Sequence, residues 1–169
     1  MDHQLTLTED LAVAPRLRGE VDLDANVRIE HWRGGHLLDV REGHNLITDA
    51  GKAGVAGLIN GISTNFFESI AIGTGTVAAA VGDTALGAEI TTAGGARGAG
   101  TTSQQTTTVT NDTAQVQLLF TFTGSFAVTE SGLLNVPTTG GTLLARQVFS
   151  ALNVVSGDSL TITWKVKAS

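Results

Sequence analysis

The sequence predicts an all-β fold: an antiparallel β-sandwich or barrel, jelly-roll-like, with one short Gly-rich helix and an extended N-terminal arm. Three observations predict this class. Apolar and polar residues alternate in several short segments, turn-forming residues separate the segments at short intervals, and one stretch alone has convincing helical spacing. Short strands with few crossover helices pair antiparallel, so a parallel sheet is not expected.

Residues 1–25 are predicted to form the arm. Their apolar residues share one parity, as in a strand, without a strand partner nearby in the sequence. An extended segment of about 20 residues reaches roughly 60 Å, far enough to pair with an edge strand of a neighbouring subunit. The alternative is a disordered acidic tail. The predicted interaction residues of the arm are Leu5, Leu7, Leu11 and Val13.

Residues 26–169 are predicted to form a single β-rich domain that begins with a hairpin. A first strand carries Val27, Ile29 and Trp32, and the glycines at residues 34–35 supply a two-residue turn. The second strand is expected to turn again at residues 42–43, before residues 45–47 extend the sheet.

One helix is predicted near residues 49–62. Thr48 offers an N-cap and Gly61 a stop signal. Three glycines inside this helix each cost about 1 kcal/mol relative to alanine, which predicts close packing against a sheet or another subunit. The apolar residues at helical spacing are Val55, Leu58, Ile59 and Ile62.

The chain after the helix is predicted to contain a short strand at residues 69–72, a long irregular segment at residues 77–105, and then a run of strands. The irregular segment is rich in Gly, Ala and Thr and shows no sustained period. The later strands are expected at residues 107–110, 115–123, 127–136, 142–150 and 159–166.

Composition excludes several classes of function. The 169 residues include no cysteine, so disulfides and thiolate chemistry are excluded. Ten Lys and Arg against sixteen Asp and Glu give a net charge of -6, which opposes binding to phosphates, so no nucleic-acid partner is expected. No stretch approaches the roughly 20 apolar residues that cross a bilayer, so no membrane partner is expected.

Charged residues make up 15% of the chain, and 21 residues are glycine. Charged residues are depleted at the cores of interfaces between subunits. We therefore expect the chain to bind copies of itself in a closed homo-oligomer, a homotrimer above all.

Two groups of residues invite a chemical interpretation. Residues 73–78 match the form G-x-G-x-x-A of a dinucleotide-binding turn, but no repeated strand-helix-strand units surround them, so a tight turn is the preferred interpretation. His31, His36 and His44 share one hairpin region and would bind zinc if they converged, although their spacing matches no named motif. We predict no metal, no cofactor and no catalytic residues, hence no enzyme.

Several sequence blocks resemble virion structural proteins of tailed bacteriophages. In order, they read NLITDAGKAGVAGLINGIS, FFESIAIGTGT, DTALGAEI, TESGLLN, LLARQVFS and GDSLTITWKV, within residues 45–167. The short length and the predicted arm are most similar to trimeric head-decoration (auxiliary capsid) proteins, and there is no fibre-like shaft repeat. Tail-associated and fibre-associated proteins are relatives in the same group.

The resemblance implies a capsid decoration protein that binds the outer capsid lattice as an oligomer and stabilises it through contacts of its arms. The implied partners are further copies of the chain and the major capsid protein or another virion protein, on the capsid surface or, alternatively, on the tail. The alternative functions are a tail, baseplate or fibre-associated structural protein, and a module that binds host glycans.

Overall fold

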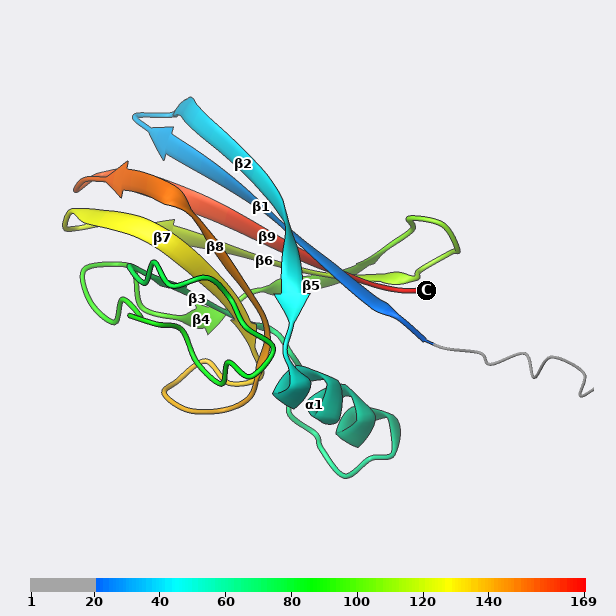
Figure 1. The fold of residues 1–169 in the computed structure, drawn as a ribbon. Helices are drawn as coiled ribbons and strands as arrows, with labels where there is room; N and C mark the ends of the chain where they lie inside the picture. Colours follow the sequence, from blue (N-terminus) through cyan, green and yellow to red (C-terminus); the bar gives the residue numbers. More distant parts are fainter. Residues whose placement is uncertain (1–20) are drawn as a thin grey trace, which may run out of the picture.

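The computed structural model describes residues 21–169 (Figure 1), so the predicted arm residues Leu5, Leu7, Leu11 and Val13 lie outside the described residues. Nine strands and one helix form this part of the chain. The strands are β1 (Leu23–Arg33), β2 (His36–Ile47), β3 (Ser69–Gly73), β4 (Gly98–Ala99), β5 (Thr101–Gln105), β6 (Thr113–Thr121), β7 (Phe126–Leu134), β8 (Leu143–Val154) and β9 (Asp158–Ala168), and the helix is α1 (Asp49–Ile59).

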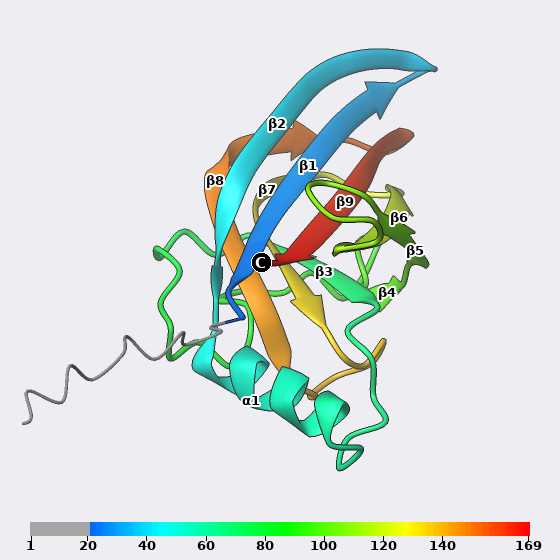
Figure 2. The same cartoon turned by 90° about the vertical axis from the view of Figure 1, so that its right-hand side faces the viewer.

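The strands form one antiparallel sheet in the order β4-β3-β7-β8-β2-β1-β9-β6-β5, which confirms the predicted all-β fold with one short helix. The two outermost strands of this order, β4 and β5, are separated in the chain by Gly100 alone. The two edges of the sheet therefore meet, and the sheet curls into a nearly closed barrel (Figure 2).

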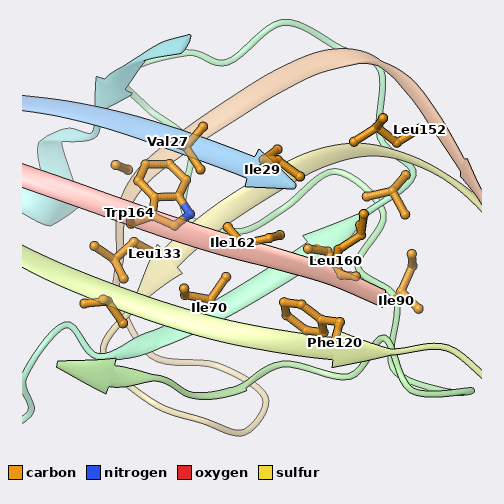
Figure 3. Close-up of a cluster of buried hydrophobic side chains, with 14 of the residues drawn as sticks. Val27, Ile29, Ile70, Ile90, Phe120, Leu133, Leu152, Leu160, Ile162 and Trp164 are labelled. Atoms are coloured by element: carbon orange, nitrogen blue, oxygen red, sulfur yellow. The ribbon is translucent and has the colours of Figure 1, made fainter. Parts of the chain in front are cut away.

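The core follows the two-residue period of the strands (Figure 3). On β9, Leu160, Ile162 and Trp164 point inward and are fully buried. The indole Nε1 of Trp164 donates a hydrogen bond to Ser131 Oγ on β7 at 3.1 Å, and Ser131 Oγ donates to the carbonyl of Ala71 on β3 at 3.0 Å. The indole N–H of Trp164 and the hydroxyl of Ser131 are thus paired across the interior of the barrel.

The helix begins as predicted, because Thr48 Oγ1 accepts the backbone N–H of Gly51 at 2.9 Å. It ends at Ile59, three residues earlier than predicted, and Gly61 takes a positive φ of 72° just beyond it. A Cβ on Gly51 would lie 2.5 Å from the Leu144 carbonyl oxygen. This glycine therefore lets α1 contact the backbone of β8 in the same chain.

The turn predicted at residues 42–43 is wrong, because β2 runs unbroken from His36 to Ile47 and both residues pair with β1. Gly43 is therefore a residue within a strand and not part of a turn. A Cβ on Gly43 would lie 3.1 Å from Gln147 Nε2 of β8, so Gly43 leaves room for the end of the Gln147 side chain.

The strand predicted at residues 107–110 is also wrong, since this segment is a loop and the strand β5 lies before it. The carboxylate of Asp112 accepts the backbone N–H groups of Thr107, Thr108 and Val109, each at 2.8 Å. An Asp side chain that bonds neighbouring N–H groups replaces the strand ladder with a turn.

Candidate assembly surface

Strand β2 has an open edge along most of its length. β1 pairs with its first edge from His36 to Asn45, whereas β8 pairs with its second edge through Leu46 and Ile47 alone. Over residues 36–45, therefore, no strand within residues 21–169 pairs with the second edge. An unpaired edge carries free N–H and C=O groups that another strand can bind.

Apolar side chains accompany this open edge. Leu37, Leu38 and Val40 are 45%, 50% and 36% exposed. His31 pairs with Asp39 and Trp32 with Leu37, so Leu38 is an extra residue at a β-bulge near the hairpin tip. The β1–β2 hairpin projects at the top of the barrel in Figure 1. The exposed apolar residues thus lie on the part of β2 that has no second partner strand.

Side chains hold β2 near β8 where their backbone ladder stops. The guanidinium of Arg41 donates to the carbonyl and the hydroxyl of Ser150 on β8, and it pairs with Asp39 at 3.0 Å. These contacts fix the position of the edge without using its backbone groups. These side-chain contacts therefore hold this part of β2 in place although its backbone groups on this edge have no strand partner within residues 21–169.

A buried ionic cluster anchors the hairpin. Asp158 Oδ2 lies 2.8 Å from His31 Nε2 and accepts the Val155 N–H at 3.0 Å, while Arg33 Nε donates to Oδ1 at 2.6 Å. The Arg33 guanidinium, with the His31 and Val155 bonds, holds the pKa of Asp158 well below its usual range despite burial. The cluster ties β1 to the start of β9.

The three histidines do not converge. His31 points into the barrel and contacts Asp158, whereas His36 and His44 are exposed on β2, and His44 Nδ1 lies 3.7 Å from Asp24. Within residues 21–169, no group of three His, Cys, Asp or Glu side chains is placed to hold a metal ion.

A second buried cluster centres on Glu130 of β7, which is fully buried. Arg146 Nε and Nη2 donate to Glu130 Oε2 at 2.9 and 2.7 Å, and Arg146 Nη1 pairs with Asp83 at 2.7 Å. Burial opposes the charged form of Glu130, but the bonds from backbone N–H groups and from Arg146 outweigh it and lower its pKa. Arg146 thereby fastens the irregular segment that contains Asp83 to the barrel.

The same carboxylate explains the glycine motif at residues 73–78. Gly75 N–H donates to Glu130 Oε1 at 2.9 Å, and Gly87 and Ala88 N–H groups donate to its oxygens at 2.9 and 2.7 Å. A Cβ on Gly73 or Gly75 would lie 2.4 Å from Glu130 Oε1. These N–H groups thus bind a side-chain carboxylate of the protein itself.

Sequence reasoning missed both ionic clusters, although a signal exists for one of them. Glu130 and Arg146 each interrupt a strand of mainly apolar character, within TESGLL and LLARQV. A charge inside a buried strand requires a buried partner, and these two charges have opposite signs. The Asp158 cluster offers no such signal, because Asp158 lies between the strands expected at residues 142–150 and 159–166, where a charged residue is ordinary.

Comparisons with protein-family models, with curated proteins and with solved structures find no match to this chain. Among residues 21–169, no helix is long and apolar enough to cross a membrane.

Proposed function

We propose that this protein is a non-enzymatic structural protein of a tailed-bacteriophage virion, a capsid decoration protein that binds the outer capsid lattice as an oligomer. The observation that carries the proposal is the open edge of β2 with its exposed apolar residues Leu37, Leu38 and Val40. Monomeric proteins protect such edges, so an exposed one favours assembly with another chain.

The buried charges support a structural role. Asp158 and Glu130 are surrounded by groups of the protein that neutralise or bond them, and each cluster joins segments distant in the sequence. Catalytic acids and bases need access to substrate, whereas these carboxylates are 0% exposed.

The predicted arm supplies a partner for the open edge. Leu5, Leu7, Leu11 and Val13 share one parity, so an extended arm would place them all on one face while its backbone pairs with β2 of a neighbouring subunit. Such an exchange of arms around a closed ring accounts for the proposed homotrimer.

Decoration then works through linked equilibria. A protein that binds the assembled lattice and not its separated subunits stabilises the lattice by RT ln(1 + [L]/Kd), about 2.7 kcal/mol per site at a concentration 100 times the Kd. Arms that join adjacent copies add multivalent attachment, which strengthens binding without any new contact to the capsid.

The test is to image particles of the phage that encodes this chain by electron cryo-microscopy, with and without added purified protein. We expect density of this fold on the outer capsid surface, at positions where several capsid subunits meet. Density on the tail, or none on any particle, would overturn the assignment to the capsid.

A matched pair of variants tests the edge. Val40→Asp places a charge on the open edge, whereas Val109→Asp changes an exposed valine, 67% exposed, in the β5–β6 loop. We expect Val40→Asp to shift the protein toward monomer in sedimentation velocity and to reduce particle occupancy, with Val109→Asp unchanged. Equal assembly of both variants would count against the β2 edge.

A further inference from the structure

The outward side chains of β1 line one face of the barrel. Alternate residues of β1 are buried, which leaves the others on the outside. The outward residues of the same parity are Asp24, Asn26, Arg28, Glu30 and Trp32. Since β9 pairs with β1 along its whole length, and β6 with β9, each outward residue of β1 continues into a row across three strands.

These rows are built mainly from hydroxyl and amide side chains. Arg28 is paired with Thr163, which is paired in turn with Gln117, and Gln117 Nε2 donates to Thr163 Oγ1 at 2.9 Å. In the same way, Trp32 is followed by Ser159 and then by Thr121. Amides and hydroxyls both donate and accept hydrogen bonds, so this surface suits a ligand that does the same.

The charges on this face largely neutralise one another. Arg28 Nη2 lies 2.8 Å from Glu30 Oε1, and Arg28 Nη1 also bonds Glu42 of β2. Lys165 of β9 lines the same hollow, so the two cations Arg28 and Lys165 balance the two carboxylates Glu30 and Glu42. A balanced set of charges favours neither an anionic nor a cationic ligand. A ligand of this face is therefore expected to be uncharged.

The face is hollowed in two adjoining places. A hollow of about 700 Å³ is lined by residues that include Asn26, Gln115 and Gln117, and a second of about 390 Å³ is lined by residues that include Trp32 and Thr161. From Asn26 to Trp32 the strand spans roughly 20 Å, so the two hollows together accept an extended molecule.

Trp32 is the residue of this face that the fold does not explain. The other tryptophan, Trp164, fills the core, whereas Trp32 lies outward and partly exposed beside Leu119, which is 59% exposed. An indole presents a flat apolar surface with one polar N–H, the combination that suits ligands with apolar and polar faces.

We propose that the outer face of β1, β9 and β6 binds a neutral oligosaccharide. The ring of Trp32 packs against the C–H face of one sugar, and the amides of Gln117 and Asn26 bond sugar hydroxyls farther along the groove. A sugar chain is extended, uncharged and rich in groups that donate and accept hydrogen bonds, which matches the three properties of the face. The proposal does not depend on capsid binding or on the β2 edge.

The two tryptophans make the test direct, because the chain contains no tyrosine and Trp164 is 0% exposed. The full-length protein is applied to an array of neutral and acidic oligosaccharides of bacterial, plant and animal origin. The strongest ligands are then titrated by calorimetry and by acrylamide quenching of fluorescence. We expect neutral oligosaccharides to bind and to protect Trp32 from the quencher, and the origin of those bound identifies the source of the natural ligand.

Three variants assign the binding to this face. Trp32→Ala is expected to weaken the affinity by about tenfold or more, and Trp32→Phe to retain part of it through a smaller aromatic ring. Phe66→Ala removes an exposed aromatic residue, 66% exposed, from the loop after α1, away from this face, and is expected to leave the affinity unchanged. Binding of acidic sugars alone, equal binding by Trp32→Ala, or no binding on the array would overturn the proposal, and none of these results bears on capsid binding.

Discussion

Arg146 Nη2 and Glu130 Oε2 lie 2.7 Å apart, and both side chains are buried within the wall formed by β7 and β8. Their charges stabilise each other, and each buried charge requires the other as its partner. Removing one partner of a buried pair leaves an uncompensated charge, whereas replacing both by neutral groups removes the problem.

We therefore expect Arg146→Met to lower the free energy of unfolding by about 3–5 kcal/mol. The double variant Arg146→Met with Glu130→Gln should lose less, because no buried charge remains and an amide oxygen in the place of Oε1 still accepts the N–H groups of Gly75 and Ala88, which leaves one N–H, that of Gly87, without its acceptor. Urea unfolding at one fixed protein concentration measures both values. A double variant that is less stable than Arg146→Met would contradict the interpretation that the unpaired carboxylate causes the loss.

The stability of the protein should fall in acid. The pKa values of Glu130 and Asp158 are both lowered in the folded state, so the unfolded state binds protons first as the pH falls. The stability that these carboxylates contribute is complete above their unfolded pKa values, near 4, and is lost as the pH falls through their lower folded values.

Asp158→Asn tests this dependence. The variant should be less stable at pH 7, because Arg33 and His31 lose their charged partner, but its stability should change less between pH 7 and pH 3. Thermal melts across this range supply the comparison. An identical pH dependence in the variant and the original protein would show that Asp158 does not contribute to it.

The sequence predicted the strands in which buried apolar residues alternate with outward residues, because this alternation is visible within the strand itself. The alternation of Val27 and Ile29 on β1, and of Leu160, Ile162 and Trp164 on β9, predicts strands because it needs no knowledge of the partner. The cap at Thr48 is equally local. These predictions agree with the structure because their physical cause lies within a few residues.

The two errors have different causes. Gly43 lies beside the side chain of Gln147 of β8, a contact that the neighbouring sequence does not reveal. The loop at residues 107–110 has a local cause that the residue pattern did not bring out, because Asp112 accepts the N–H groups of Thr107, Thr108 and Val109. The open edge of β2 was equally hidden, since it depends on the pairing of β2 with β8 ending after two residues. Pairing between strands far apart in the sequence leaves no local pattern.

Two glycines of α1 allow the effect of close packing on stability to be compared with the effect of helix propensity. Gly51→Ala would force a Cβ to within 2.5 Å of the Leu144 backbone and should destabilise the protein by about 1–3 kcal/mol. Gly57→Ala meets Ser63 Cβ at an ordinary 3.4 Å, so the better helix propensity of alanine should stabilise by up to about 1 kcal/mol. Urea unfolding measures both. Equal effects of the two changes would show that contact with β8 is not the reason for Gly51.

The last prediction concerns the arm and its partner strand. The chain has no cysteine, so introduced thiols report on one contact without interference. We expect Leu7→Cys protein mixed with Leu38→Cys protein to form a disulfide-linked dimer under mild oxidation, because paired strands bring opposite Cβ atoms to about 4.5–5.5 Å, close to the roughly 3.5–4.5 Å of a disulfide. Non-reducing gel electrophoresis measures the product.

The control is Leu7→Cys protein mixed with Val109→Cys protein, whose thiol lies in the β5–β6 loop and should remain unlinked. The double variant Leu7→Cys with Leu38→Cys distinguishes exchange between subunits from pairing within one chain. It should give covalent oligomers if the arm reaches a neighbour, and a cross-linked monomer if the arm folds back on its own β2. A cross-linked monomer, or equal cross-linking at Val109, would contradict arm exchange through the β2 edge.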